Sequence, residues 1–215
     1  RTCLVGSEMC IRDRSWKTQS GQAWFHIDQH PISKPGKQCI QGLINLLPTS
    51  KEIGGNVVIP KSHNFFKDIP EEYKERVERL PLDIDHFRFP HDDPKLSSEP
   101  AVMAHMEPGD MLLWDSRTIH CSSSGSSLPE GTNDLIRAAS LICMMPKELS
   151  SKEILDKRIH AAENLVSTTN WTNDFRNADE FPIILEAENR DQYKWPKKPN
   201  SVSYTHLTLP TTVFV

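Results

Sequence analysis

Two histidines and one aspartate stand at a spacing that can build a metal site. His26 and Asp28 are separated by one residue, and His120 follows far along the chain. Because alternate side chains of a β-strand share a face, His26 and Asp28 would point the same way while Phe25 and Ile27 pack on the other side. Two imidazoles and one carboxylate leave half of an octahedron open, which suits non-haem Fe(II) that must bind a co-substrate and O₂ together. We therefore predict His26, Asp28 and His120 as metal ligands and catalytic residues.

The neighbouring sequence strengthens this prediction, since a His-x-Asp motif alone is common by chance among surface residues. Trp24 and Phe25 precede the motif, and the turn at residues 108–110 leads into an apolar run just before His120. His63 is predicted to be structural. Other histidines lack a partner spacing typical of ligation, namely His30, His86, His91, His105 and His160.

The elements that must position these residues are mostly short strands. Runs of alternating or apolar residues, bounded by Gly, Pro, Ser and Asp, predict a sandwich or small barrel of β-strands. The predicted strands cover residues 39–47, 56–60, 101–106, 111–114 and 136–145. Residues 82–99 predict a long loop, which could carry specificity or be inert.

Two helices are predicted beside the strands. One covers residues 70–80, with Tyr73, Val77 and Leu80 on one side. The second begins at Ser150, whose side chain would form a capping box with Glu153. Its apolar face would carry Leu155, Ile159, Ala162 and Val166.

The composition is that of one ordinary globular domain. The chain has 215 residues, of which 37% are hydrophobic and 25% charged, and its formal net charge is −4. No basic patch for nucleic acid is evident, and no apolar run reaches the length of a membrane span. Cys39, Cys121 and Cys143 are scattered, which is typical of reduced thiols. We expect a small-molecule substrate, no nucleic acid, no membrane span and no obligate protein partner. The cellular location is open, with the cytoplasm or another reducing compartment favoured.

The two ends of the chain have an unusual property. Residues 4–14 (LVGSEMCIRDR) can be back-translated into a string that contains AGATGTGTATAAGAGACAG. Residues 201–211 (SVSYTHLTLPT) can be back-translated into a string that contains CTGTCTCTTATACACATCT, the reverse complement of AGATGTGTATAAGAGACAG. This pairing is typical of transposase-type sequencing adapters that have been translated. We therefore expect residues 1–14 and 201–215 to be non-native and residues 15–200 to be part of one domain.

Several spaced segments resemble one family. In order, they are WFHIDQHP, CIQGLINLLP, GGNVVIPKSHNFF, EPGDMLLWDSRTIHCS and IRAASLICMMP, and they cover roughly residues 22–172. Together they resemble the phytanoyl-CoA dioxygenase-like branch of the Fe(II)/2-oxoglutarate dioxygenases. The resemblance implies a mainly β fold, a double-stranded β-helix (a cupin-like jelly roll) with a few peripheral helices. His26, Asp28 and His120 would lie at its open end and hold Fe(II).

The resemblance also implies how the co-substrate 2-oxoglutarate would bind. Its distal carboxylate needs a fixed bidentate cation, and Arg137 matches the family's arginine in order and place. A surface salt bridge is the alternative role for Arg137. Ser122 could donate a hydroxyl to the co-substrate. Some relatives place a serine two positions after the arginine, where this chain has Ala139, so the second carboxylate contact is open.

Polar residues near the metal motif could line the pocket. Gln41, Leu43 and Asn45 would alternate on one face of a strand, so Gln41 could touch the co-substrate and Asn45 the substrate. The alternative for Gln41 is an ordinary hydrogen-bonded position inside a sandwich. Arg117 could bind an acidic substrate or simply pair with Asp115.

The implied reaction consumes O₂, releases succinate and CO₂ from 2-oxoglutarate and hydroxylates a C–H bond, with ascorbate as a helpful reductant. Halogenating relatives replace the carboxylate ligand with a small residue, whereas Asp28 is present here, so hydroxylation is favoured. One rival is a catalytically silent jelly roll that binds a ligand or a protein. Another is a cupin-like metalloenzyme that isomerises its substrate without 2-oxoglutarate, and Arg137 would be dispensable in that case.

Family members begin well before the His-x-Asp motif, whereas only residues 15–25 precede it here. We therefore expect an N-terminally truncated domain that lacks an edge strand and an N-terminal cover. Poor solubility or weak activity of the fragment would follow.

Overall fold

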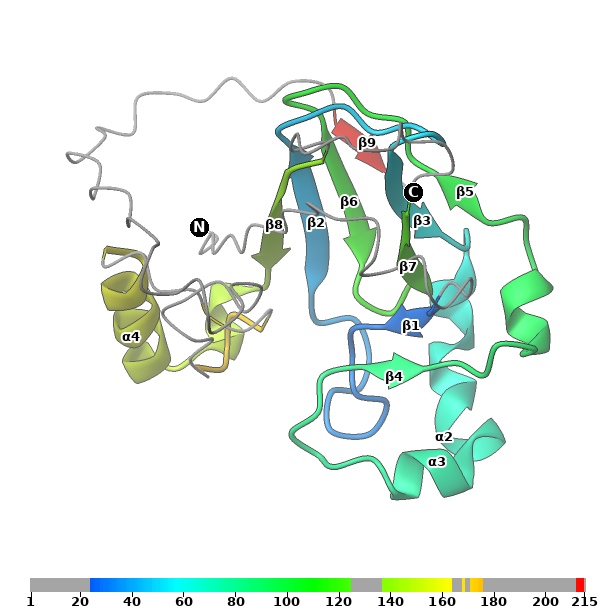
Figure 1. The fold of residues 1–215 in the computed structure, drawn as a ribbon. Coiled ribbons are helices and arrows are strands. Elements are labelled where there is room, and N and C mark those ends of the chain that lie inside the picture. The colour runs from blue at the N-terminus through cyan, green and yellow to red at the C-terminus, as the bar shows by residue number, and fades with distance from the viewer. Residues whose placement is uncertain (1–23, 125–136, 164–167, 169–170, 176–211, 215) are drawn as a thin grey trace, which may run out of the picture. The chain divides into compact units, whose positions relative to one another are not determined.

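The computed structural model describes residues 24–124, 137–163, 168, 171–175 and 212–214. The chain divides into two compact units, one of residues 8–141 with 210–215 and the other of residues 1–7 with 142–209. The first unit contains the predicted metal ligands and most of the strands (Figure 1).

The described strands form two sheets, so the chain is mainly β as predicted. The five-stranded sheet has the order β4 (Phe87–Arg88), β1 (His26–Ile27), β7 (His120–Ser124), β3 (Gly54–Val58) and β5 (Val102–Met103). The four-stranded sheet has the order β8 (Ala139–Met144), β2 (Ile40–Asn45), β6 (Met111–Asp115) and β9 (Thr212–Phe214). β9 runs parallel to β6, whereas β2 and β6 are antiparallel, as are the paired strands of the five-stranded sheet.

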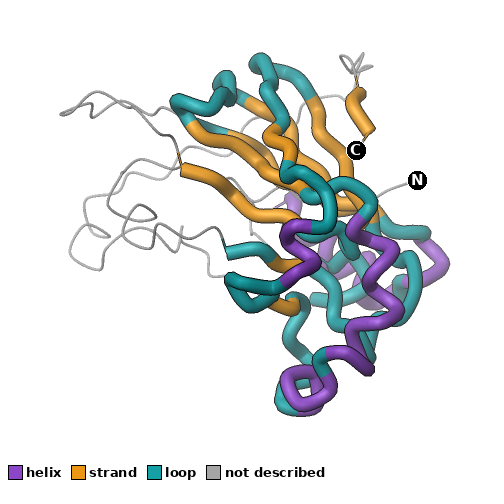
Figure 2. The backbone as a smooth tube through the Cα atoms, turned by 90° about the vertical axis from the view of Figure 1, so that its right-hand side faces the viewer, coloured by secondary structure: helices purple, strands orange, loops and turns teal. Residues whose placement is uncertain are grey.

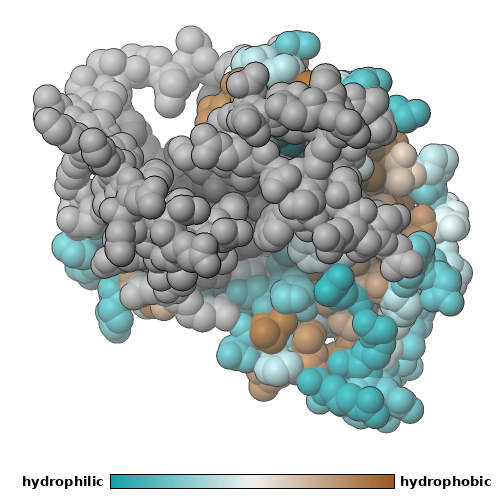
Figure 3. Space-filling model, in the orientation of Figure 1, coloured by the Kyte–Doolittle hydropathy of each residue, from teal (hydrophilic) through white to brown (hydrophobic). Residues whose placement is uncertain are grey.

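A set of short helices packs against one face of the five-stranded sheet. The buried Ile27 of β1 and Ile119, directly before β7, belong to an apolar cluster with Phe66, Ile69 and Val77 of the helical segment. The helices are η1 (Ser62–Asp68), α2 (Ile69–Glu72) and α3 (Lys74–Glu78), and they gather beside the strands in both ribbon and tube views (Figures 1 and 2). The solvent side of α3 is charged, which the space-filling view shows as a hydrophilic surface (Figure 3).

A second apolar cluster lies on the inner face of the four-stranded sheet. Leu43 of β2 is paired with Leu112 of β6, and both belong to this cluster together with Trp114. Met106 and Ala139 complete its buried part. Neighbouring residues of a strand point to opposite faces, whereas every second residue shares a face. Gln41 and Asn45 therefore lie on the same inner face as Leu43.

Three predicted strands correspond closely to β2, β6 and β8. Two others differ in extent: β3 begins two residues earlier than predicted, and β5 keeps only Val102–Met103 of the expected 101–106. The predicted long loop was wrong in two places, since it contains β4 and the helix η2 (Pro94–Ser97). In β4, Phe87 is buried against the apolar cluster and Arg88 is exposed. This alternation extends over only two residues, which is too short a pattern to predict a strand from the sequence.

The helix predictions were right in place and wrong in detail. The segment predicted as one helix over 70–80 is broken at Tyr73 between α2 and α3. The second helix is α4 (Lys152–Glu163), and it follows η3 (Lys147–Leu149). Its first-turn hydrogen bond comes from Ser151, whose Oγ accepts from the Ile154 N–H, instead of from Ser150. Ile159 is 52% exposed, whereas Arg158 and Ala161 are buried, so the buried face is rotated from the predicted one. Ala162 and Val166 lie outside the residues whose side chains are described.

Two further predictions can be compared with this part of the chain. Cys39, Cys121 and Cys143 are buried free thiols, as expected. Across the described residues, no helix has the length and apolarity needed to cross a membrane. β9 lies within residues 201–215, and the expectation that this segment is non-native stays a prediction, to be tested by independent amplification of the source locus.

Candidate metal centre

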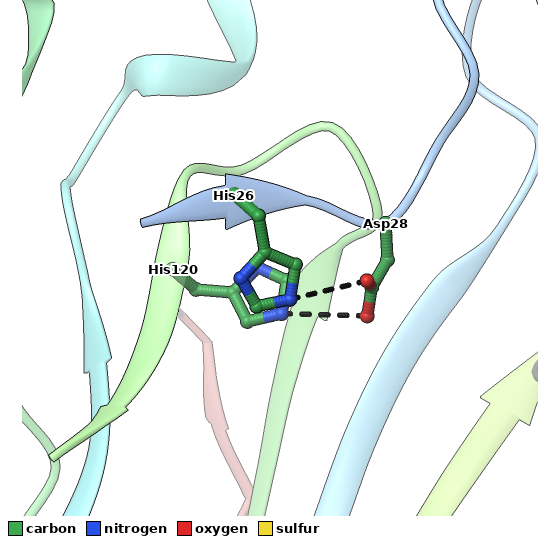
Figure 4. A group of neighbouring side chains, drawn as sticks. All are labelled: His26, Asp28 and His120. Carbon is green, nitrogen blue, oxygen red and sulfur yellow. Dashed lines mark ion pairs between the residues drawn. The ribbon is translucent and has the colours of Figure 1, made fainter. Parts of the chain in front are cut away.

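The three predicted metal ligands come together on neighbouring strands. β1 and β7 pair antiparallel with His26 directly opposite His120. Asp28 follows β1, and its backbone N–H donates to the Ser116 carbonyl at 3.1 Å, which holds the residue beside the turn that leads into β7. The side chains point toward one another (Figure 4). Of the groups searched in the described residues, these three alone have ligand atoms converging within 4.8 Å.

The distances between the ligand atoms fit a metal ion. His26 Nε2 lies 3.2 Å from Asp28 Oδ1, and His120 Nε2 lies 3.5 Å from Asp28 Oδ2. Metal–ligand bonds of about 2.1 Å at right angles would separate neighbouring ligand atoms by about 3 Å. The two distances end on different oxygens of Asp28, and one ligand atom from each of the three residues lies within 4.8 Å of the others, which is close enough for all three to bind one metal ion.

Backbone carbonyls fix the orientation of both imidazole rings. His26 Nδ1 lies 3.1 Å from the Trp24 carbonyl oxygen, and His120 Nδ1 lies 2.9 Å from the Thr118 carbonyl oxygen. A carbonyl only accepts, so each Nδ1 carries a hydrogen and each Nε2 is the ring nitrogen left for a metal ion. Both Nε2 atoms face the Asp28 carboxylate.

The surroundings favour the protonation states that a metal requires. Burial lowers the pKa of His26 below its usual value and outweighs the opposing effect of Asp28. Burial would raise the pKa of Asp28, but the interactions with His120 and His26 outweigh it and hold that pKa well below the ordinary range. A neutral imidazole and an ionised carboxylate are the forms that bind metal at neutral pH.

A second layer of side chains surrounds the ligands. Gln41 donates from Nε2 to Asp28 Oδ2 at 3.0 Å, and Trp114 Nε1 donates to Gln41 Oε1 at 3.1 Å. Trp24 stacks on His26 with 4.0 Å between ring centroids and 2° between planes. These contacts hold the carboxylate and one imidazole in place.

Arg137 lies at the start of the segment that becomes β8, and its guanidinium has an unusual environment. The residue is 4% exposed, and Nη1 has no hydrogen-bond partner among the residues that the structure describes. Burial lowers the pKa of Arg137 below its usual value. A buried guanidinium N–H without an acceptor is costly, so an anion that accepts from Nη1 would stabilise the folded protein.

The remaining predicted residues have varied surroundings. Ser122 shares a face of β7 with His120 and is paired in register with Asn56 of β3. Asn45 is buried and donates from Nδ2 to Thr49 Oγ1 at 3.2 Å. Arg117 forms a two-pronged ion pair with Asp115, at 2.8 Å and 2.7 Å, which is the simpler of its two predicted roles.

Sequence reasoning missed Asn56. Its side chain is buried, and Nδ2 has no acceptor within the described part of the chain. Its register with Ser122 places it on the same face of the sheet as the ligand His120. A polar residue opening the predicted strand 56–60 was the available signal.

A cleft of about 730 Å³ lies beside η1. None of His26, Asp28 and His120 lines it. Its walls are Pro31, Pro35, Gly36, His63, Asn64, Phe66, Lys67, Pro70 and Arg117.

Fold and site together define a β-sheet protein in which two histidines and one carboxylate converge at a position that fits one metal ion. Residues 12–128 match the model of the family described as phytanoyl-CoA dioxygenase (PhyH). The chain belongs to this family, and the resemblance noted in the sequence is confirmed. The family match favours the expected non-haem iron and 2-oxoglutarate enzyme.

Individual relatives are more distant. The chain is 30% identical over 154 residues to the Ava biosynthesis cluster protein O of Aspergillus versicolor, covering 68% of this chain and 47% of that protein. The chain thus spans about half the length of the curated relative it matches. Among solved structures, EctD from S. alaskensis with 2-oxoglutarate and 5-hydroxyectoine is 13% identical, with a TM-score of 0.39, over 68% of this chain and 45% of that chain. The α-ketoglutarate-dependent carbocyclase SnoK is 18% identical, with a TM-score of 0.38, over 57% and 44%.

Proposed function

We propose that this chain is the catalytic part of an Fe(II)- and 2-oxoglutarate-dependent dioxygenase that hydroxylates a C–H bond of a small metabolite or acyl substrate. The observation that carries the proposal is a site of three candidate metal ligands in the same unit as a buried arginine whose Nη1 has no acceptor among the described residues. The two sheets are proposed to be the halves of a double-stranded β-helix with His26, Asp28 and His120 at its open end. The relative from a biosynthesis cluster favours a small metabolite as substrate.

The residues present fit the proposed cofactor. Nε2 of His26, Nε2 of His120 and one oxygen of Asp28 would hold Fe(II) and leave half of its coordination sphere open. Bound Fe(II) would supply the activation of O₂ beside 2-oxoglutarate. In the overall reaction, one oxygen atom of O₂ enters succinate as 2-oxoglutarate loses CO₂, and the other enters the alcohol product.

Arg137 is the proposed anchor of the co-substrate. Its planar guanidinium can bind the distal carboxylate through two parallel hydrogen bonds, which would supply the missing acceptor for Nη1. Ser122 and Asn56, which share a sheet face with His120, are proposed to donate further hydrogen bonds to the same molecule. Asn56 would then replace the contact that Ala139 cannot make.

Two tryptophan side chains beside the histidine ligands are proposed to exclude water from the site. Trp24 covers one face of the His26 ring, and Trp114 lies 5.2 Å from the His120 ring. These indole rings keep the imidazoles out of bulk solvent and leave one side for a substrate. Asn45 and Arg117 are weaker candidates for substrate contact, since each already has a partner in Thr49 or Asp115.

The test is release of succinate and CO₂ from 2-oxoglutarate with Fe(II), ascorbate and air. His120→Ala should abolish turnover, whereas His105→Ala, at an exposed position outside the centre, should leave it unchanged. Turnover that survives His120→Ala would refute the assignment of the centre. Metal binding without succinate release in the wild type would favour a binding module instead.

Arg137 separates the proposal from a cupin-like isomerase. Arg137→Met should abolish succinate release if the guanidinium anchors 2-oxoglutarate. An isomerase would retain its turnover in this variant, because its reaction has no dicarboxylate co-substrate to hold.

A further inference from the structure

Gln41 links the metal ligand Asp28 to the opposite sheet. Its side chain is 3% exposed and lies between two hydrogen-bond partners, Trp114 at 3.1 Å and Asp28 at 3.0 Å. On β2 and β6, Gln41 and Trp114 are directly opposite each other, so the sheet register itself sets their contact. Gly42 allows the close approach of the two strands, since a Cβ there would lie 2.5 Å from the Leu112 carbonyl oxygen.

The chemistry of the partners determines which way the Gln41 amide points. The indole N–H of Trp114 can only donate, so the amide oxygen must face it. The amide NH₂ then faces Asp28, whose ionised carboxylate can only accept. The opposite orientation would set two donors together and an oxygen against a carboxylate. Trp114 therefore fixes Gln41 as a donor to Asp28.

We propose that Gln41 is a positioning residue that engages Oδ2 of Asp28 and leaves Oδ1 as the single oxygen for the metal. This inference rests on the metal centre of the proposed function. A carboxylate bound through one oxygen occupies one coordination position, whereas a carboxylate bound through both would occupy two and crowd the co-substrate and O₂. Gln41 thereby acts on the metal through Asp28, in place of the direct co-substrate contact expected from its sequence position.

The test measures metal affinity without turnover. Co(II) is titrated into the full chain, and its binding is followed by calorimetry for the wild type, Gln41→Met and Trp114→Phe. Methionine keeps a similar side-chain volume but cannot donate. Gln41→Met should weaken Co(II) binding by about 10- to 100-fold, the range for loss of a residue that orients a metal ligand. Trp114→Phe should have a smaller effect, below about tenfold, because the freed amide can still donate.

Two measurements separate this role from a merely structural one. The control Gln38→Met removes a glutamine whose amide donates to the Pro35 carbonyl outside the centre, and it should bind Co(II) as the wild type does. The affinity of the Co(II)-loaded protein for 2-oxoglutarate should fall together with the metal affinity in Gln41→Met, since an Asp28 carboxylate bound through both oxygens would take a position that the co-substrate needs. Urea unfolding of the metal-free variants reports any general loss of stability.

Each outcome decides the inference. Wild-type Co(II) affinity in Gln41→Met would overturn it, and a weakened 2-oxoglutarate affinity with unchanged metal affinity would assign Gln41 to the co-substrate instead. If Gln41→Met does not fold, an unchanged Co(II) affinity in Trp114→Phe overturns the proposal that Trp114 orients Gln41 toward Asp28. A wild type that binds Co(II) but releases no succinate would refute the proposed function alone. A wild type that binds no divalent metal would refute both.

Discussion

Replacing Arg137 should make the protein more stable in the absence of 2-oxoglutarate. The guanidinium is 4% exposed and Nη1 has no acceptor in the described residues, so the folded state bears an unsatisfied charged donor. Removing a buried donor without a partner recovers about 1–3 kcal/mol, while methionine retains most of the apolar packing. Arg137→Met should therefore raise the free energy of unfolding by about 1–3 kcal/mol.

Adding 2-oxoglutarate should reverse this order. A ligand present at about 100 times its Kd stabilises the folded protein by about 2.7 kcal/mol, and at about 1,000 times by about 4.1 kcal/mol. The wild type should gain this stability in the presence of Co(II), whereas Arg137→Met should gain none. The assay is urea unfolding of both proteins, with saturating Co(II) throughout and with or without 2-oxoglutarate.

Arg158→Met is the matched control. Arg158 is also buried, but its Nη1 donates to the carbonyl oxygens of Trp171 at 2.9 Å and Asp174 at 2.8 Å. Its loss should lower the free energy of unfolding by about 1–3 kcal/mol, because the carbonyls lose their donor. If Arg137→Met were destabilising to the same degree and still responded to 2-oxoglutarate, the inference that Arg137 awaits an anion would be refuted.

Three further predictions concern the strands, the pH dependence and the second co-substrate contact. Gly42→Ala should lower the free energy of unfolding by about 1–3 kcal/mol, since its Cβ would lie 2.5 Å from a backbone oxygen. Gly55→Ala, whose Cβ would have no contact closer than 3.4 Å, should be nearly neutral, and equal unfolding free energies of the two variants in urea would contradict this prediction. Burial depresses the pKa values of His26 and His30 in the folded protein, so the unfolded chain takes up protons at a higher pH than the folded chain does. The free energy of unfolding of the metal-free protein should therefore be highest above pH 6.5 and should decrease as the pH falls toward the folded pKa values. Identical urea midpoints at about pH 7.5 and about pH 5.5 would exclude this effect. Asn56→Ala should weaken 2-oxoglutarate binding to the Co(II)-loaded protein by up to about tenfold at unchanged Co(II) affinity; calorimetry showing wild-type 2-oxoglutarate affinity would remove Asn56 from the site.

Local periodicity was enough to predict how the ligands are presented. In the segment around β1, Phe25 and Ile27 pack into the apolar cluster, and this leaves His26 and Asp28 on the opposite face. The same alternation placed Gln41 inside β2. Such patterns depend only on neighbouring residues and on the two-residue period of a strand.

What could not be predicted depends on contacts between distant segments. The predicted helix over 70–80 breaks at Tyr73, whose hydroxyl donates to Asp93 Oδ2 at 2.5 Å, a partner that helix periodicity does not reveal. Arg88 of β4 lies opposite His26 in register, although residues 82–99 have the composition of a loop. The link from Gln41 to Asp28 joins two sheets, whereas the alternation of residues along one strand suggested a co-substrate contact instead.

The pairing of His26 with His120 has a consequence for the durability of the fold. β1 has two residues, and its register with β7 consists of this one pair, while β4 is attached to the sheet through β1. A metal held by both histidines would close the chain between residues 26 and 120 much as a disulfide does. In the chain-entropy model, a cross-link around a loop of about 100 residues is worth about 4–5 kcal/mol. Removal of the metal by a chelator would then abolish the activity and also weaken the pairing of β1 with β7. Increased proteolysis after β1 would report the loss of metal.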